Sequence, residues 1–599
     1  MSRSKPANLR ESLPGFHRLW PHVKPHLAAE RRLLIGGSVA MLAEVVMRLL
    51  EPWPLKYVID GVIASTGSDI AGTPPTDLTA VLILASLALV AVTTLRAVAS
   101  YLMTVTFALA GNRLLTRVRA DLYAHLQQLP MAFHDNARTG DLVTRVTSDV
   151  GRLKEVAVTA ALPLLGNTVT LVGMVAVVAF IDWQLALVML LVFPLFFVFS
   201  IRLSRRINTV SRTQRKAEGA LASLATETLS AMRVVKAYSL EKRMQESFAS
   251  SNQKSLKDGV KGKRLSAGLE RKTDVLVGVA TAIVLFVGAQ RVLAGAMTPG
   301  DLVVFLTYLK AAFKPMRDVA KYTGRIAQAA ASSDRIVDVL TLSPAISDRP
   351  GARTAERFRG DIEFRNVWLE YEPGQPVLRG FDLAVAAGQK VAVVGPSGAG
   401  KSSLANLLSR LCDPTHGVVA VDGRDLRDLT MASVRSQLAV VLQESVLFAT
   451  SIRENIALGL AAAPPSQDQI EAAARLAGAH DFIERLPAGY DTVVGERGAT
   501  LSGGERQRIA IARAAMRDAP IVILDEAMTG LDQETEREVV SALDRLTSGR
   551  TTLLITHDLD AALGAERVVW VEVGRVVDDG APARVLARQG GRYDDAGLG

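Results

Sequence analysis

Six long apolar segments in the first half of the chain constrain its fold more than any other feature. Each is about as long as a membrane span, which needs about 20 residues. They run near 33–58, 78–110, 157–181, 184–202, 273–295 and 299–320. A charged fraction of only 22% and a mean hydropathy of +0.23 agree with a membrane protein. We therefore expect six α-helical transmembrane spans, which make the lipid bilayer one partner of the chain.

The distribution of basic residues predicts how these spans are oriented. The loop from Gly61 to Asp77 and the turn from Ile181 to Trp183 contain no Lys or Arg, whereas residues 113–154 and 202–272 are rich in both. Basic loops stay on the cytoplasmic side, so both termini should be cytoplasmic. This pattern explains the net charge of +9 better than nucleic-acid binding does. We expect no cleavable signal peptide, and Gly15 to Arg32 should form an amphipathic helix along the inner membrane surface.

A glycine-rich loop in the second half predicts nucleotide binding. Val391 to Val394 is a short apolar run that leads into Gly395-Pro-Ser-Gly-Ala-Gly-Lys401-Ser402, after which a helical pattern begins. In that context the glycines let backbone N–H groups face a β-phosphate, Lys401 reaches the β- and γ-phosphates and Ser402 binds Mg²⁺. Tyr371 lies upstream, where its ring can stack on adenine. The expected ATP contacts in the loop are Gly395, Ser397, Gly398, Ala399, Gly400, Lys401, Ser402 and Ser403.

Two further patterns typical of buried strands end in polar residues. The aliphatic run from Ile521 to Leu524 delivers Asp525 and Glu526 at its carboxyl end, where open α/β sheets bind ligands. Asp525 is suited to orient Mg²⁺ through water, and Glu526 is suited to polarise the attacking water as general base. The run from Thr551 to Ile555 precedes His557, which can hydrogen-bond the γ-phosphate. We expect Lys401, Glu526 and His557 to serve catalysis.

A short string further along resembles the signature of the ATP-binding cassette (ABC) family. It is Leu501-Ser-Gly-Gly-Glu505, followed by Arg506-Gln507-Arg508. The resemblance implies that this loop caps the γ-phosphate of the ATP held by an opposite cassette, through Ser502, Gly503, Gly504 and Glu505. Backbone amides at a helix N-terminus do form such an anion seat.

Other strings resemble the same family. Gln443 resembles its Q-loop glutamine, which touches Mg²⁺ and the membrane domain, so the implied metal ligands are Ser402, Gln443 and Asp525. Gly495-Glu-Arg-Gly498 resembles a loop that exporters of this family place before the signature. The D-loop reads Thr529-Gly-Leu-Asp532 where many exporters have Ser-Ala-Leu-Asp, and it keeps Asp532.

The resemblance covers nearly the whole chain and implies its architecture. A six-helix α-helical transmembrane domain with long cytoplasmic helical extensions should precede an α/β P-loop ABC ATPase domain with a helical subdomain. We expect a cytoplasmic segment at 1–32, the transmembrane domain at 33–340, a linker at 341–360 and the nucleotide-binding domain at 361–599. Short transverse helices of the extensions should press into the cassette, with Phe133 and Tyr238 as the coupling residues. Cys412 should be a packed residue rather than a reactive one.

One membrane half and one cassette cannot close a transport path, so a dimer should be the functional unit. Intact catalytic and signature motifs favour a homodimer, and a heterodimer with a related half-transporter stays open. The expected function is ATP-driven export of a lipid, drug, peptide or similar substrate by alternating access. The alternatives are an importer built on the exporter fold and an ATP-gated channel or regulator. The six spans exclude a soluble ABC ATPase.

Charged residues also stand inside the apolar segments. Glu44 and Arg48 are one helical turn apart in the first span, and Arg96 lies in the second. Such groups cost at least about 2.5 kcal/mol each at mid-bilayer when unpaired, so they should face the bundle interior or one another. Glu44 and Arg96 lie at similar depth, so an ion pair between them is one interpretation. A polar substrate path through all three is the other.

Overall fold

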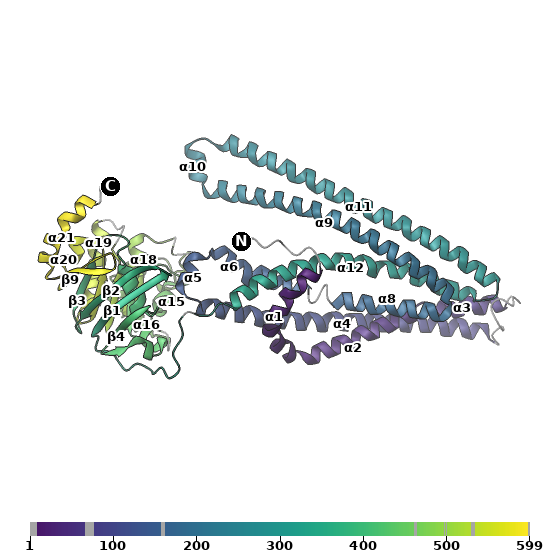
Figure 1. Ribbon diagram of the computed structural model, residues 1–599, viewed down its shortest axis with the longest axis horizontal. Helices are drawn as coiled ribbons and strands as arrows, with labels where there is room; N and C mark the ends of the chain where they lie inside the picture. Colours follow the sequence, from purple (N-terminus) through teal and green to yellow (C-terminus); the bar gives the residue numbers. More distant parts are fainter. Residues whose placement is uncertain are drawn as a thin grey trace. The chain divides into compact units, whose positions relative to one another are not determined.

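The chain forms two compact units (Figure 1). The computed structural model describes residues 9–65, 77–156, 162–344, 346–460, 464–495, 498, 500–528 and 533–596. The first unit comprises Met1–Gln127 and Thr139–Leu342. The second comprises Gln128–Arg138 and Ser343–Gly599, so a short piece of the N-terminal half clusters with the C-terminal half.

The described part of the first unit is helical throughout. Together with α5, which belongs to the second unit, its helices are α1 (Leu9–Ala29), α2 (Arg31–Leu50), α3 (Trp53–Ser65), α4 (Leu78–Gln128), α5 (Met131–Asn136), α6 (Thr139–Thr144), the π-helix η2 (Arg145–Asp149), α7 (Val150–Val156), α8 (Leu162–Ile181), α9 (Trp183–Ser230), α10 (Met232–Ala237), α11 (Glu241–Leu293) and α12 (Pro299–Leu340).

Four stretches of the described residues are long and apolar enough to cross a membrane. They are Arg31–Ser65, Leu78–Gln128, Pro163–Ile181 and Asp274–Leu293. The two other expected spans, 184–202 and 299–320, lie in α9 and α12. The α12 segment carries Lys310, Lys314, Arg317 and Asp318, which makes it less apolar than the rest.

Polar side chains at the ends of the spans tie the helices of this unit together. Asp182 caps α9 by accepting from the backbone N–H of Leu185 at 3.0 Å, and it also receives Arg291 of α11 at 3.0 and 2.7 Å. Asp60 of α3 accepts the backbone N–H of Gly300 at 2.8 Å. A Cβ on Gly300 would lie 2.7 Å from the Asp60 carboxylate, so only glycine lets α12 begin this close to α3. Buried residues of α8, α9, α11 and α12 form the core beside these anchors.

Helices α9 and α11 run side by side as one long hairpin, and α10 joins them at its tip (Figure 1). α12 packs against α1, α3, α7, α8, α9 and α11. Most of the predicted amphipathic helix, from Gly15 to Ala29, lies in α1, whereas Arg31 and Arg32 begin α2. Arg18 of α1 pairs with Asp334 and Asp338 of α12. Glu30, directly after α1, pairs with Arg113 and Arg117 of α4. These bonds attach α1 to other helices, and its position along the membrane surface stays a prediction.

The second unit is built on two sheets. A six-stranded sheet has the order β10-β9-β3-β8-β7-β6, in which only β10 is antiparallel to its neighbour, and an antiparallel sheet has the order β2-β1-β4-β5. The strands are β1 (Ile362–Glu372), β2 (Gln375–Val385), β3 (Lys390–Val394), β4 (His416–Val421), β5 (Arg424–Asp425), β6 (Leu438–Val441), β7 (Ile521–Asp525), β8 (Thr551–Ile555), β9 (Arg567–Glu572) and β10 (Arg575–Gly580).

Helices complete the described part of the second unit. They are α13 (Lys401–Leu408), α14 (Met431–Arg435), α15 (Ile452–Ala457), α16 (Gln467–Leu476), α17 (His480–Glu484), α18 (Gly503–Ala515), α19 (Gln533–Thr547), α20 (Leu559–Leu563) and α21 (Pro582–Ala596), with short 3₁₀ turns η4 (Leu426–Asp428) and η5 (Gly489–Asp491).

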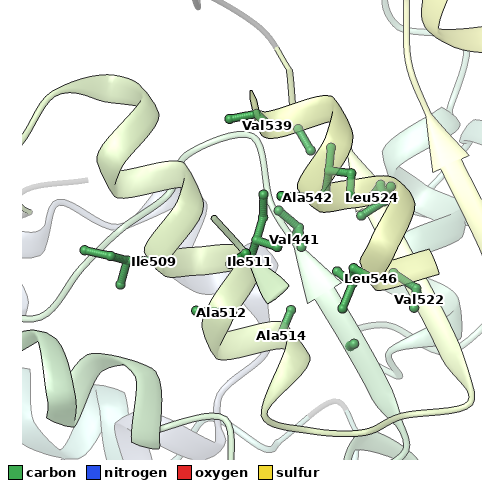
Figure 2. Close-up of a cluster of buried hydrophobic side chains, with 14 of the residues drawn as sticks. Val441, Ile509, Ile511, Ala512, Ala514, Val522, Leu524, Val539, Ala542 and Leu546 are labelled. Carbon is green, nitrogen blue, oxygen red and sulfur yellow. The ribbon is translucent and has the colours of Figure 1, made fainter. Parts of the chain in front are cut away.

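Alternate residues of the central strands enter two different cores, as expected of strands buried on both faces. In β7, Val522 and Leu524 join one core, whereas Ile521 and Ile523 join the other. Figure 2 shows the first core, where side chains of α18 and α19 converge on β6 and β7. Cys412 packs against the second core, and burial raises the pKa of its thiol to about 11. This is the packed position predicted from the sequence.

Candidate functional site

The glycine-rich loop joins β3 to α13, as the sequence predicts. Two close approaches require its glycines: a Cβ on Gly395 would lie 2.0 Å from the backbone oxygen of Val571, and one on Gly400 would lie 2.9 Å from the Leu378 side chain. Gly400 also has a φ of +94° directly before the first residue of α13. The loop backbone therefore curls at the N-terminus of α13, where N–H groups can face an anion. Within the loop, Ser397 and Gly398 are exposed and Ala399 is buried.

Lys401 begins α13 and folds back over the loop. Its side chain is buried, and its Nζ donates to the backbone oxygens of Gly395 at 2.8 Å and Pro396 at 2.9 Å. Burial lowers the pKa of Lys401, and the nearby carboxylates of Glu526 and Asp525 oppose that shift. The ammonium group therefore lies between the loop and two acidic residues that the sequence places far away.

Ser402 and Asp525 meet at the carboxyl ends of the central strands. The Ser402 hydroxyl donates to Asp525 Oδ1 at 3.1 Å. Burial raises the pKa of Asp525, although this hydrogen bond opposes the shift. The sequence predicts both as Mg²⁺ ligands, and the structure brings them together.

Glu526 follows β7 in a strained backbone conformation. Its φ is +50°, which costs a residue with a Cβ about 1–2 kcal/mol. Its N–H donates to the backbone oxygen of Ile555 in β8 at 2.9 Å, and this bond fixes the turn. Gln443 Nε2 donates to Glu526 Oε2 at 2.7 Å, and His557 Nδ1 lies 3.4 Å from Glu526 Oε1. Three residues that the sequence predicts separately thus form one cluster around a carboxylate.

Tyr371 reaches the first turns of α13 through its hydroxyl. The hydroxyl donates to Ser403 Oγ at 3.2 Å and accepts from Asn406 Nδ2 at 3.3 Å. The residue remains 44% exposed, so a ring face is accessible beside the phosphate loop. Sequence reasoning missed Asn406, whose only signal is its place one turn after Ser402 in the same helix.

The signature begins helix α18. Ser502 is the N-cap of a reciprocal capping box: its Oγ accepts from the Glu505 N–H at 3.3 Å, and Glu505 Oε2 accepts from the Ser502 N–H at 2.8 Å. The Ser502 hydroxyl also donates to Glu505 Oε2 at 2.8 Å. Gly503 is exposed, whereas Gly504 is buried so closely that a Cβ would lie 1.9 Å from Thr535 Cγ2 of α19. Across the described residues, the side-chain hydrogen bonds of Ser502 and Glu505 stay within this capping box. Asp532 of the predicted D-loop lies outside the described residues.

The two predicted coupling residues differ in their surroundings. Phe133 lies in α5, is half-buried, and packs edge-on against His134 with ring centroids 5.4 Å apart. Residues 128–138 cluster with the cassette unit. Tyr238 follows α10 and is 74% exposed, as are its apolar neighbours Leu229 and Val234 at 68% and 52%.

The charged residues of the spans are partnered differently from the interpretation drawn from the sequence. Arg96 hydrogen-bonds to Glu51, not to Glu44. Glu51 directly follows α2, where the chain turns through Pro52 into α3, and this brings it to Arg96. Glu44 and Arg48 are half-buried in α2, and neither makes a side-chain hydrogen bond or ion pair with a described residue. Sequence reasoning also missed Lys310, whose signal is a charge inside the last apolar segment.

Comparison with known proteins gives the family. Residues 33–316 match the protein family described as "ABC transporter transmembrane region", and residues 378–529 match the family described as "ABC transporter". The chain is 38% identical to an ATP-dependent lipid A-core flippase of Syntrophus aciditrophicus over 583 residues, 96% of this chain and 93% of that protein. It is 33% identical to the uncharacterized ABC transporter ATP-binding protein YfiC of Bacillus subtilis, over 99% of this chain and 95% of the relative.

A solved structure has the same fold. The bacterial Atm1-family ABC exporter with ATP bound superimposes with a TM-score of 0.75 at 29% identity, over 94% of this chain and 97% of that chain. The fold class predicted from the sequence is confirmed, with a helical membrane domain followed by an α/β ATPase domain. The chain therefore belongs to the ABC transporter family, as a multi-pass membrane half-transporter of the exporter type that joins one membrane domain to one ATPase domain.

Proposed function

We propose that two copies of this chain form an exporter in which Glu526 is the general base for ATP hydrolysis. The observation that carries this proposal is that both oxygens of the Glu526 carboxylate have a side-chain partner. Gln443 donates to one oxygen, and His557 lies beside the other. A carboxylate fixed in this way can accept a proton from water aligned with a γ-phosphate. Phosphoryl transfer depends mainly on positioning and electrostatic stabilisation, so the fixed orientation is the useful property.

Two further features of the site suit the phosphates and the metal, namely Lys401 at the loop and the pair of Ser402 and Asp525. Lys401 has its ammonium at the loop, and turning away from the carbonyls of Gly395 and Pro396 would bring it to the β- and γ-phosphates. Mg²⁺ takes hard oxygen ligands and keeps several waters and phosphate oxygens, so it needs few protein ligands. The Ser402 hydroxyl beside the Asp525 carboxylate is such a donor set. The ion would neutralise charge that develops on the phosphates.

The signature supports a dimer with two shared ATP sites. Among the described residues, the side chains of Ser502 and Glu505 bond only to each other's residue within the first turn of α18. The exposed N-terminus of this helix is therefore available to a ligand held by another cassette. Catalytic and signature residues are all present in one chain, so a homodimer needs no second gene product. The exposed apolar tip around Tyr238 would then bind the cassette of the second copy. Helix α5, by contrast, clusters with the cassette of its own chain.

The last span supports an amphipathic substrate that carries negative charge. α12 buries Phe305, Tyr308 and Phe313, whereas Lys310 and Lys314, one turn apart, are exposed. Ionisable residues in membrane spans face the bundle interior or a water-filled cavity, so this face should line the transport path. The lipid A-core flippases among the relatives are named for a lipid substrate, which agrees with this assignment.

ATP would drive the cycle by binding one state more tightly than the other. Two ATP molecules enclosed between cassettes favour the outward-open state, and hydrolysis returns the dimer to the inward-open state. The cassettes and both termini face the cytoplasm in this proposal, as the basic loops indicate.

The proposal can be tested in proteoliposomes with outward-facing cassettes. We expect ATP-dependent transfer of a fluorescent phosphatidylglycerol across the bilayer, with less transfer of the matched phosphatidylcholine. Lys310→Ala/Lys314→Ala should reduce phosphatidylglycerol transfer, whereas Lys254→Ala/Lys257→Ala, which removes two exposed lysines of α11, should not. Transfer without ATP would contradict the export proposal, and equal transfer of both lipids would contradict the anionic preference.

A further inference from the structure

Gln507 is a buried polar residue that none of the predicted site roles uses. It lies in α18, five residues after the N-cap Ser502, and is 5% exposed. Its Nε2 donates to the backbone oxygen of Ala527 at 2.7 Å, and its Oε1 accepts from the hydroxyl of Ser445. Both ends of the amide are therefore used, and a buried amide is retained only when its bonds are made.

The two partners of Gln507 lie directly beside the catalytic cluster. Ala527 follows Glu526 in the chain, and Ser445 comes two residues after Gln443. Because Gln443 donates to the Glu526 carboxylate, the four side chains and the short backbone segments between them form a closed ring. Glu526 sits in this ring with a φ of +50°, a conformation that persists only where the surroundings fix it.

Helix α18 also contacts the segment that follows Gln443 through a second residue. Arg513, further along the helix, donates to the backbone oxygen of Val446 at 3.1 Å and to that of Asn455 at 2.9 Å. A displacement of α18 therefore moves the segment after Gln443 as well as the backbone after Glu526. The signature forms the first turn of this helix.

We propose that Gln507 is a positioning residue for hydrolysis. It makes the position of the Glu526 carboxylate depend on the position of the signature helix α18. This inference rests on the proposed role of Glu526 as general base. The signature would engage ATP held by the second copy, and Gln507 would pass the resulting position of α18 to the carboxylate of its own chain. An amide fits both contacts, because its NH₂ group donates to the Ala527 oxygen and its oxygen accepts from the Ser445 hydroxyl. Gln507 touches neither the nucleotide nor the water in this arrangement.

The first test replaces Gln507 with Leu, which keeps the approximate volume and removes both hydrogen bonds. The dimer's kcat for ATP should fall about 10- to 100-fold, as misplacement of a catalytic group does, while its affinity for a fluorescent ATP analogue changes less than about threefold. Ser445→Ala, which removes one of the two bonds, should lower kcat less and in the same direction. This milder variant provides the measurement if Gln507→Leu does not fold.

Gln437→Leu is the matched control. Gln437 also donates through its amide, to the carbonyls of Glu356 at 2.8 Å and Ser433 at 3.4 Å, and accepts from the Phe358 N–H at 2.7 Å, but it lies against the start of the cassette. It should change melting temperature without lowering kcat of the folded protein. If the Gln507 and Gln437 variants lower kcat equally, the positioning role is wrong and Gln507 only stabilises the cassette.

A double-mutant cycle with Glu526→Gln separates the linkage from the proposed function. Single-turnover hydrolysis should be as slow in Glu526→Gln/Gln507→Leu as in Glu526→Gln alone, because a positioning residue has no effect once its carboxylate is absent. If the two losses multiply, Gln507 acts by another route and the inference fails. If Glu526→Gln alone remains active, the general-base assignment is wrong, and the linkage to it fails with it. If Glu526→Gln is inactive and Gln507→Leu is fully active, only the linkage fails.

Discussion

Asp149 of the π-helix η2 and Arg335 of α12 form a bidentate ion pair, with Arg335 Nε and Nη2 at 2.7 and 2.5 Å from the two carboxylate oxygens. Asp149 is 1% exposed and also accepts from the Ser332 hydroxyl at 3.0 Å. Burial raises the pKa of Asp149, but the hydrogen bonds and charge of Arg335, with the Ser332 bond, outweigh it and hold the pKa below its ordinary range. The pair joins the helix that leads to the cassette with the segment that follows α5 and α6.

Replacing Asp149 with Asn should therefore destabilise the membrane unit. Arg335 remains partly exposed, so the loss should be about 1–3 kcal/mol, as for a hydrogen bond to a charged group. A fall in the melting temperature of the purified protein at neutral pH measures it. Asp274→Asn, which removes an exposed pair with Arg271, should leave the melting temperature unchanged.

The same pair predicts a pH dependence. A carboxyl whose pKa is lower in the folded protein contributes stability above its unfolded pKa, and that contribution is lost as the pH falls through the folded pKa. The difference in melting temperature between wild type and Asp149→Asn should thus be constant near neutral pH. It should shrink only in acid, below the ordinary range of an aspartate. A difference that disappears between pH 6 and 8 would assign the effect to another group.

Replacing Glu526 with Gln should abolish turnover without abolishing ATP binding. The amide keeps the shape and loses the base, so hydrolysis should fall by about 10²-fold or more. Phosphate release and nucleotide affinity, measured on the same preparation, distinguish the two steps. Glu484→Gln, at an exposed acid of α17, is the control. Wild-type turnover in Glu526→Gln would remove this residue from the catalytic role.

Lys401→Ala should instead weaken binding of the triphosphate. The variant removes a buried cation beside the phosphate loop, and a hydrogen bond to a charged group corresponds to an affinity loss of about 10- to 100-fold. Lys390→Ala, at the other end of β3, removes a lysine that pairs with Asp544 and should keep the affinity. Normal ATP affinity with failed turnover in Lys401→Ala would contradict the phosphate-clamp assignment.

Substitutions of the two acidic residues Glu44 and Glu51 should have different effects. Glu51 is held by Arg96, so Glu51→Gln should lower thermal stability and leave the response to transported compounds unaltered. Glu44 makes no such pair with a described residue, so Glu44→Gln should keep basal ATPase activity and change which compounds stimulate it. Stimulation profiles of the two purified variants across a lipid and drug panel make the comparison. Identical profiles in wild type and Glu44→Gln would leave Glu44 outside the transport path.

Local patterns were enough to predict the phosphate loop, the strand-end acids and the signature, because each is a short string whose neighbours define its context. The structure adds relationships between distant segments. The partner of Arg96 depends on a turn at Pro52 that apolar spacing does not specify. The left-handed Glu526 is set by Ile555 of another strand. Gln507 did carry a local signal, since it lies on the buried face of α18 with Gly504 and Ile511, but its partners come from two other segments.

The discontinuous cassette unit has a consequence for synthesis of the chain. Residues 128–138, including α5, belong to the unit that otherwise starts at Ser343. At about 5–20 residues per second, a ribosome needs roughly 10–40 s to make the intervening helices. α5 is therefore made long before the rest of the unit with which it clusters, and the last four long helices, α8, α9, α11 and α12, are synthesised in that interval. The nucleotide-binding unit can therefore be completed only after all the helices of the first unit have been made.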